Sequence, residues 1–250
     1  MRYILLLTVV LASNAFAAPD FDETMAEANQ GAAYAQFNLG VMYDNGDGVP
    51  ENDAEAVRWF RKAADQGYAP AQFNLGNMYH FGEGVPVNDA EAVKWYRKAA
   101  DQGDADAQFN LGNMYNVGKG VPENDAEAVK WYRKAADQGD ATAQYNLGVL
   151  YERGNGVPEN DAEAVKWYRK AADQGKRTAQ FNLGVMYYNG DGVPENHVRA
   201  YVWLSMAKTQ GYESAKKAVE TVKNLMTKQQ IAQAQALATQ CYESDYKDCD

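Results

Sequence analysis

Apolar residues recur along the chain in two alternating helical patterns. Between residues 33 and 44, Ala35, Leu39, Met42 and Tyr43 follow the spacing of one face of an amphipathic helix. A second set with helical spacing follows a short segment that contains Gly and Pro. Its members are Val57, Trp59, Phe60, Ala63 and Ala64. The pattern predicts two helices joined by a turn.

The second predicted helix has recognisable ends. Asn52 stands three residues before Glu55, which is the arrangement of a capping box, where each side chain hydrogen-bonds the other residue's backbone N–H. Gly67 follows the last apolar position, and glycine readily adopts the left-handed conformation that ends many helices. We therefore expect this helix to begin after Asn52 and to end before Gly67.

The turn between the helices could be taken for a calcium loop. The segment DNGDGVPEND, from Asp44 to Asp53, contains four carboxylates and two glycines, and it recurs every 36 residues. Asp47 becomes Lys119 in the third copy, and a lysine cannot coordinate a hard cation that needs oxygen ligands. All five copies keep G-x-G-V-P, with two residues that tolerate positive φ and a proline of fixed φ. We interpret the segment as a turn and expect no metal site.

The repeat fills residues 31–210. Its five units are residues 31–66, 67–102, 103–138, 139–174 and 175–210. Each unit has two predicted helices and no strand, and a period of this length is typical of a solenoid. We therefore predict an all-α solenoid of five 36-residue helix-turn-helix repeats, in which each unit buries its apolar face against its neighbours.

Both ends of the repeat array depart from the pattern. Residues 18–30 resemble a truncated second helix and are expected to form an N-terminal capping helix. In the fifth unit, Val202, Leu204 and Met206 add apolar surface that needs a cover. Residues 211–240 are expected to supply it as C-terminal capping helices, the second of which begins with a capping box. The positions that define these helices are Ala215, Val219, Val222, Leu225, Thr227, Gln230, Ile231, Ala234 and Ala238.

The first unit carries three motifs: A-x-x-x-L-G-x-x-Y in residues 35–43, G-x-G-V-P in residues 46–50 and A-A-x-x-G in residues 63–67. Together they resemble the Sel-one-like repeat family, relatives of the tetratricopeptide repeats. The resemblance implies a right-handed superhelix whose first helices line a concave face. It also implies an adaptor of protein complexes, and in bacteria a periplasmic or secreted protein.

Residues 1–17 have the features of a secretory signal peptide. A charged start precedes an apolar run over residues 4–12, and Ala15 and Ala17 occupy the A-x-A positions that a signal peptidase recognises. The alternative is an uncleaved anchor helix, but the run is too short to span a bilayer. We predict cleavage between Ala17 and Ala18, a periplasmic or secreted location, and no membrane insertion after cleavage.

The charge of the chain argues against two classes of partner. The formal charge is −10, and it becomes −11 if Arg2 is removed with the signal peptide. Nucleic acid and anionic membrane surfaces are bound by basic patches. We therefore expect neither to be a partner.

The two cysteines, Cys241 and Cys249, lie in an acidic tail over residues 241–250. An even number of cysteines behind a signal peptide favours a disulfide. The alternative is a pair of free thiols in a frayed tail. We expect a disulfide that closes a short loop, so that its reduction changes global stability little.

Residues suited to catalysis are few. His80 and His197 are the only histidines, and we find no nucleophile elbow, phosphate-binding loop or zinc-binding helix motif. Ser214 and Lys217 match S-x-x-K, and some cysteine-rich members of the family are described as binding or hydrolysing β-lactams. The motif's usual companions S-D-N and K-T-G are missing. We expect no enzyme and no cofactor, and we keep a β-lactam-processing hydrolase as an alternative.

The first helix has a second face that points away from the buried stripe. At 100° per residue, Phe37 and Val41 lie nearly opposite that stripe. The position of Phe37 is aromatic in every unit, and the next position is always asparagine. The two rows are Phe37, Phe73, Phe109, Tyr145 and Phe181, and Asn38, Asn74, Asn110, Asn146 and Asn182.

Two further positions on this face differ among the units. One is Val41, Asn77, Asn113, Val149 and Val185, and the other is Asp44, His80, Asn116, Glu152 and Tyr188. Such variation is expected of a groove that binds a non-repetitive partner. The alternative is that the aromatic and asparagine rows belong to packing between units. Our leading hypothesis is a non-catalytic adaptor that binds a protein or peptide on its concave face, and the alternative is a secreted factor that engages a host or cell-surface protein.

Overall fold

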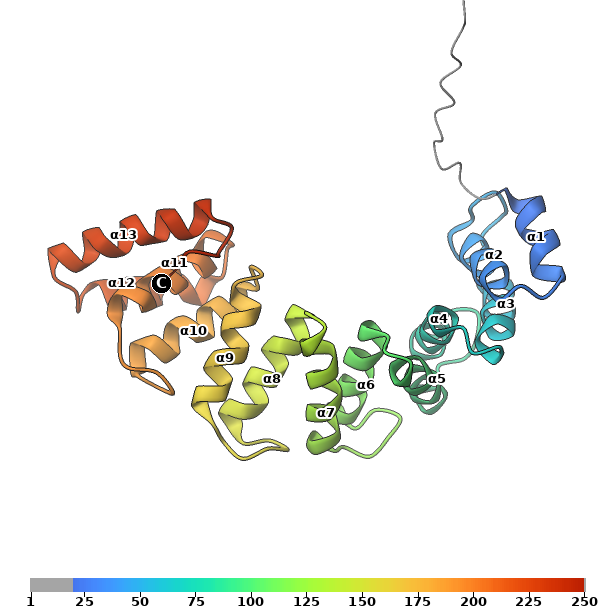
Figure 1. Cartoon of the computed structure of the whole chain (residues 1–250), viewed down its shortest axis with the longest axis horizontal. Coiled ribbons are helices and arrows are strands. Elements are labelled where there is room, and N and C mark those ends of the chain that lie inside the picture. The colour runs from blue at the N-terminus through green and yellow to red at the C-terminus, as the bar shows by residue number, and fades with distance from the viewer. Residues whose placement is uncertain (1–19, 250) are drawn as a thin grey trace, which may run out of the picture.

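The computed structural model describes residues 20–249, which form thirteen α-helices and no strand (Figure 1). In chain order the helices are α1 (Phe21–Asn29), α2 (Ala33–Asn45), α3 (Asp53–Asp65), α4 (Ala69–Phe81), α5 (Asp89–Asp101), α6 (Ala105–Val117), α7 (Asp125–Asp137), α8 (Ala141–Arg153), α9 (Asp161–Ala172), α10 (Arg177–Asn189), α11 (His197–Thr209), α12 (Glu213–Lys223) and α13 (Lys228–Glu243). The five pairs from α2 to α11 are the five repeats. The predicted fold class, an all-α solenoid of helix-turn-helix repeats, is confirmed.

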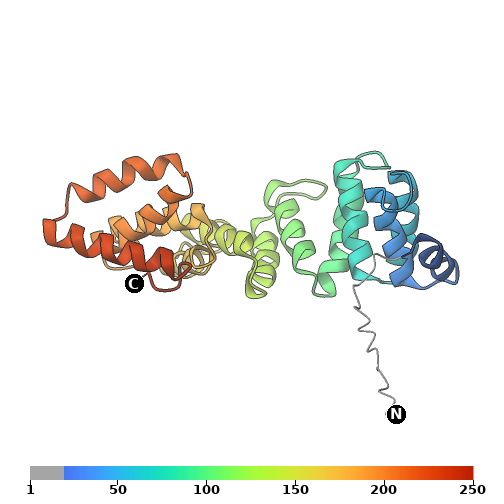
Figure 2. The same cartoon turned by 90° about the horizontal axis from the view of Figure 1, so that it is seen from above.

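The helix pairs are stacked along an arc. Figure 1 shows α1 at one raised end of the arc and α12 with α13 at the other. Within a repeat the two helices pack against each other, and each second helix packs against the first helix of the next repeat. Viewed from above, the chain advances steadily along its long axis (Figure 2). Neighbouring repeats therefore supply the core of the fold.

The turn glycines have the predicted positive φ, but only one of the two predicted capping hydrogen bonds is observed at Asn52. Gly46 and Gly48 have φ of +73° and +75°. The Glu55 backbone N–H donates to Asn52 Oδ1 at 3.1 Å, as the predicted cap requires. The prediction that the Asn52 backbone N–H donates to the Glu55 side chain is wrong, because it donates instead to the Tyr43 carbonyl at 2.7 Å. That carbonyl belongs to the last turn of α2, where carbonyls lack helical partners. The second predicted capping box, between Thr227 and Gln230, is confirmed.

The second glycine of the turn also lies against the preceding repeat. A Cβ on Gly84 would lie 2.4 Å from the Asp53 carbonyl carbon, at the start of α3. Such a contact is too short for any side chain. The sequence predicted the positive φ of this glycine but not its contact across repeats.

The core is a series of clusters, each shared between repeats. One cluster combines Phe60 of α3 with Leu75 and Met78 of α4 and with Trp95 of α5. The glycine inside each first helix allows close approach, since a Cβ on Gly76 would lie 2.6 Å from the Tyr96 ring. These contacts explain why glycine is found in the middle of a helix, where it is otherwise unfavourable.

A buried glutamine in each first helix joins three helices. Gln72 Nε2 donates to the Ala64 carbonyl of α3 at 3.0 Å, and Gln102 Nε2 donates to Gln72 Oε1 at 2.7 Å. The same pair of bonds recurs in all five repeats. A buried amide is costly unless it is hydrogen-bonded. This position is therefore fixed by the fold, although the sequence analysis did not single it out.

The C-terminal helices cover the fifth repeat as expected, with two corrections. Val202, Leu204 and Met206 are buried against the end of the solenoid. Leu225, predicted to share the buried face of α12, is 56% exposed because α12 ends at Lys223. The second capping helix also continues beyond the predicted end at residue 240, to Glu243.

The C-terminal tail follows the leading expectation, a disulfide that closes a short loop, and not the alternative of free thiols in a frayed tail. Cys241 belongs to α13, and the structure joins it to Cys249 with the two Cα atoms 4.4 Å apart. Both cysteines are buried, and they belong to the same core cluster as the fifth repeat. The Tyr246 ring lies beside Gly175, and Gln210 Nε2 donates to its hydroxyl at 3.4 Å. The tail therefore packs on the end of the repeat array.

Within residues 20–249, no helix combines the length and the apolar character needed to cross a membrane. The predicted cleavage site at Ala17 and Ala18 lies outside the described residues, so the signal peptide stays a prediction.

Candidate functional site

We call the surface of α2, α4, α6, α8 and α10 that carries the asparagine row the amide face. Its predicted binding residues are half-buried, with Glu152 exposed. The aromatic row, the asparagine row and the variable positions all lie on these five helices.

In the first four repeats the aromatic row packs against the second helix of the same repeat, and in the fifth the Phe181 ring lies 4.9 Å from the Tyr212 ring. The Phe37 ring lies 5.8 Å from the Phe60 ring of α3 and 5.4 Å from the Tyr68 ring, which begins the next repeat. Phe73, Phe109 and Tyr145 make the same contact with the second helix of their own repeats. These aromatic side chains therefore form the floor of the amide face.

The residue at the first variable position depends on a buried tyrosine of the second helix. The Tyr132 hydroxyl of α7 donates to Asn113 Oδ1 at 2.6 Å, and the Tyr96 hydroxyl of α5 donates to Asn77 Oδ1 at 2.7 Å. Burial raises the pKa of Tyr132 to about 12, and the Asn146 side chain of the next repeat opposes that rise by hydrogen bonding. The hydroxyl is thus enclosed by two repeats.

In the fourth repeat a different residue accepts the hydrogen bond of the tyrosine hydroxyl. Position 149 is valine, and the Tyr168 hydroxyl donates to Glu152 instead. Burial and this hydrogen bond to Glu152 raise the pKa of Tyr168, and Asn182 opposes the rise. The variation at these positions therefore has a structural cause, and it no longer supports a groove adapted to a non-repetitive partner.

We call the junctions after the second, third and fourth repeats the central seams, because a tyrosine hydroxyl closes each one. We call the junctions after the first and fifth repeats the end seams. At the first end seam the ring is Phe60, which has no hydroxyl, and Val41 replaces asparagine. Neither Asn38 nor Asn74 makes a side-chain hydrogen bond within residues 20–249. Asn74 lines a hollow of about 200 Å³ at this seam, and Asn38 lines one of about 550 Å³ on the other side of the first repeat, beside Phe21 of α1.

The last variable position forms a ladder with the start of the second helix. His80 Nδ1 lies 2.7 Å from Asp89 Oδ1, and Asn116 Nδ2 donates to Asp125 Oδ1 at 2.8 Å. The Tyr188 ring lies 5.9 Å from the His197 ring. These residues thus contact their own second helix.

In the first repeat the two residues equivalent to such a pair, Asp44 and Asp53, are both carboxylates. Burial raises the pKa of Asp44, and the nearby charges of Glu83, Asp53 and Glu51 add to the rise. The N-terminal end of the amide face is therefore acidic. In the described part of the chain, no three His, Cys, Asp or Glu residues are grouped as metal ligands would be.

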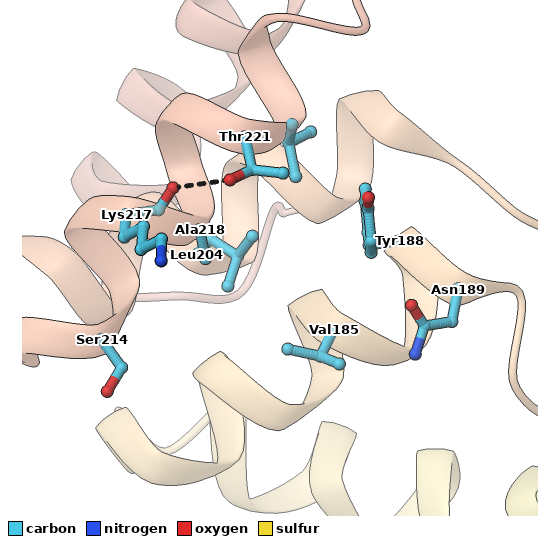
Figure 3. Close-up of a pocket in the computed structure, with 9 residues that line it drawn as sticks. Val185, Tyr188, Asn189, Leu204, Ser214, Lys217, Ala218 and Thr221 are labelled. Carbon is cyan, nitrogen blue, oxygen red and sulfur yellow. Dashed lines mark hydrogen bonds between the residues drawn. The ribbon is translucent and has the colours of Figure 1, made fainter.

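Ser214 and Lys217, the S-x-x-K match, are exposed on the first turns of α12. Within the described residues their side chains share no hydrogen bond. Both lie at the rim of a hollow between α10 and α12 (Figure 3).

A second ladder was missed by the sequence analysis. Arg61, Arg97, Arg133 and Arg169 of the second helices each donate to a tyrosine hydroxyl in the next first helix. The sequence signal was present, since arginine and tyrosine recur 18 residues apart in the first four units.

The Sel1 repeat family model matches residues 33–68, 69–104, 105–140, 141–176 and 178–212. The chain therefore belongs to the Sel1 repeat family. The matched units begin two or three residues after the predicted ones.

Two solved structures are similar over most of this chain. A protective antigen present in uropathogenic Escherichia coli strains, which displays an SLR fold, has 41% identity and a TM-score of 0.78 over 80% of this chain and 43% of its own. A Sel1 repeat protein from Oxalobacter formigenes has 40% identity and a TM-score of 0.73 over 76% of this chain and 78% of its own. The chain thus spans less than half the length of the E. coli antigen. No curated protein matches the chain.

Proposed function

We propose that the chain is a non-catalytic adaptor that binds an extended segment of a partner protein on the amide face. The family acts generally through protein interaction, and we assign the amide face to the concave side of the arc. Partner identity is a matter for experiment, and no cofactor is needed for this role.

One observation carries the proposal. The half-buried amides of Asn38 and Asn74 have no hydrogen-bond partner within the described residues, and each opens into a hollow. An asparagine amide offers both donors and an acceptor, and at Asn38 and Asn74 these groups are left for solvent or a ligand. The backbone of an extended peptide presents the complementary groups. A peptide laid across the first repeats would satisfy both amides.

We place the protein in the periplasm or outside the cell. The predicted signal peptide and the Cys241–Cys249 disulfide are both typical of an oxidising compartment. A second candidate function, a secreted factor that engages a host or cell-surface protein, is favoured by the 41% identity to an E. coli protective antigen.

Site-specific photo-cross-linking in the cells that produce the protein tests the binding face. We expect a cross-linking amino acid at Asn74 to yield protein adducts, because its side chain faces the proposed groove. The control is Lys130 of α7, which is 65% exposed and pairs with Glu127 of its own helix. Adducts at Lys130 without adducts at Asn74 would contradict the proposal.

A binding variant must leave the fold intact. Asn74→Ala removes no hydrogen bond made within residues 20–249, so we expect weaker partner binding and nearly unchanged melting. Asn113→Ala is unsuitable, because it would leave the Tyr132 hydroxyl without its acceptor. Asn113, one of the variable positions predicted to line the groove, thus takes part in the packing of its own repeat.

A further inference from the structure

The seam between the fifth repeat and α12 is built from different residues. Counting 36 residues onward, Lys217 stands where Phe181 lies in the previous repeat, and Ala218 stands where Asn182 lies. Leu204 replaces the tyrosine of the central seams. Two side chains that meet at the central seams, the tyrosine and the asparagine of the next repeat, are thus missing.

Their absence leaves a hollow of about 310 Å³ between α10, α11 and α12, which we call the end pocket. Val185, Leu204, Ala218 and Val222 supply its apolar walls. Figure 3 shows Lys217 and Ser214 on one side, from α12, and Val185, Tyr188 and Asn189 on the other, from α10. The volume is at the lower end of the range of small-ligand sites, roughly 300 Å³. It suits one apolar side chain and the backbone next to it.

One cation lies at this pocket. Lys217 makes no ion pair within residues 20–249, whereas its neighbour Lys216 pairs with Glu213 at 2.8 Å. The Asn189 amide donates to Asp191 at 2.9 Å. Among the residues that line the pocket, Lys217 is the one that carries a charge and can donate to a ligand. The chain as a whole is acidic, with a formal charge of −10, and it repels polyanions. The pocket therefore complements a single carboxylate beside an apolar group.

We propose that the end pocket binds the C-terminal residue of a partner polypeptide, with an apolar side chain between Leu204 and Val185 and the α-carboxylate at Lys217. A chain terminus carries both groups on one residue, and terminal carboxylates are a known mode of peptide recognition. The inference rests on the proposed function and adds the direction in which the partner chain runs along the amide face. The partner ends at α12, and its preceding residues follow the amide face toward the first repeat.

A pocket-filling variant can be built from the protein's own repeats. Leu204→Tyr with Ala218→Asn copies the central seams. The tyrosine ring has room, because Gly184 faces Leu204 as Gly148 faces Tyr168. We expect this double variant to fold and to close the pocket. Lys217→Gln removes the charge alone.

The test uses a library of random peptides displayed with free C-termini and selected on the full chain without its signal peptide. We expect selected peptides to end in an apolar residue. For one selected peptide, synthesised with a fluorophore at its N-terminus, amidation of the C-terminus, Lys217→Gln and the double variant should each weaken binding by roughly tenfold or more in fluorescence anisotropy.

The outcomes separate this inference from the proposed function. Selection of internal sequences, or equal binding of the amidated peptide, would overturn the end pocket. Displacement of the peptide by decanoate at the same concentration as by the free peptide would also overturn it, in favour of a fatty-acid site. If Asn74→Ala weakens binding while the pocket variants do not, the adaptor proposal stands alone. A library with no selected peptide counts against both.

Discussion

The central seams and the end seams use the same 36-residue unit and present different surfaces. At a central seam, the Tyr132 hydroxyl binds Asn113, and Asn146 of the next repeat acts on the same hydroxyl. At the end seams Phe60 and Leu204 have no hydroxyl, and hollows lie beside them. The comparison shows that the tyrosine hydroxyl distinguishes the two kinds of seam, because where it is present a side chain of the same repeat accepts its hydrogen bond.

The largest expected effect contrasts two equivalent turn glycines. Gly120 has φ of +72°, and a Cβ there would lie 2.4 Å from the Asp89 carbonyl carbon. Gly48 has a similar φ, but its nearest neighbours would be 3.7 Å away. We expect Gly120→Ala to lower the free energy of unfolding by about 3 kcal/mol, from backbone strain and overpacking together. Gly48→Ala should cost about 1 kcal/mol, from strain alone.

Urea denaturation followed by circular dichroism measures both variants. Equal losses for Gly48→Ala and Gly120→Ala would show that the turn does not press against the preceding repeat.

The next effect concerns the C-terminal end. Removing the disulfide by Cys241→Ala with Cys249→Ala should cost about 2 kcal/mol, because both cysteines lie in a packed cluster. Since repeats contact only their neighbours, the loss should be confined to the helices of that cluster, α9 to α13. Hydrogen exchange resolved by peptide measures this, and faster exchange in α6 or α7 would contradict it.

The hydroxyl pairing of a central seam can be tested by a double-mutant cycle. Asn113→Val leaves the Tyr132 hydroxyl without an acceptor and should cost about 1–2 kcal/mol. Adding Tyr132→Phe copies the Val41 and Phe60 pair of the first repeat and should recover most of that loss. If the double variant is as unstable as the two single changes added together, the pairing is not what Asn113 contributes.

The features that depend on a single helix were predictable from the sequence. The stripe of Ala35, Leu39 and Met42 predicted α2, and Asn52 predicted the start of α3, because helix periodicity and capping are local. The contacts of Gln72 and Gly84 were not predictable in this way. Each depends on a neighbouring repeat, and its partner is a backbone group that any residue supplies.

The cause of the variation on the amide face was misjudged from the sequence. Variation among Val41, Asn77 and Asn113 was read as a sign of a partner. The same variation follows the second helix, since asparagine accompanies Tyr96 and Tyr132. A comparison of the two positions within the chain would have shown this. The substitution of Glu152 for asparagine as the acceptor for Tyr168 needed the structure.

The smallest expected effect is a pH dependence at the first end seam. The pKa of Asp44 is raised in the folded state, first by burial and then by Glu83 and other carboxylates. A raised folded pKa stabilises the fold fully below the ordinary value of 3.8, and that stabilisation is lost as the pH rises through the folded value. At pH 7 the ionised Asp44 therefore opposes folding.

Asp44→Asn should raise the melting temperature at pH 7 by about 1 °C and leave it unchanged at pH 3. The matched control is Asn116→Asp, which places a carboxylate beside Asp125 in a central repeat and should lower the melting temperature at pH 7. An Asp44→Asn effect of equal size at both pH values would exclude the carboxylate charge as its cause.

Hydrogen exchange of the asparagine side-chain amides, followed by NMR, tests the difference between the seams most directly. The Asn110 and Asn146 side chains lie close enough to the buried Tyr96 and Tyr132 hydroxyls to counteract the rise in the pKa of these tyrosines, whereas Asn38 and Asn74 line hollows. We predict exchange at Asn38 and Asn74 to be about tenfold faster than at Asn110 and Asn146. Equal rates at all four residues, or slower exchange at Asn38 and Asn74, would contradict the division of the amide face into closed central seams and open ends.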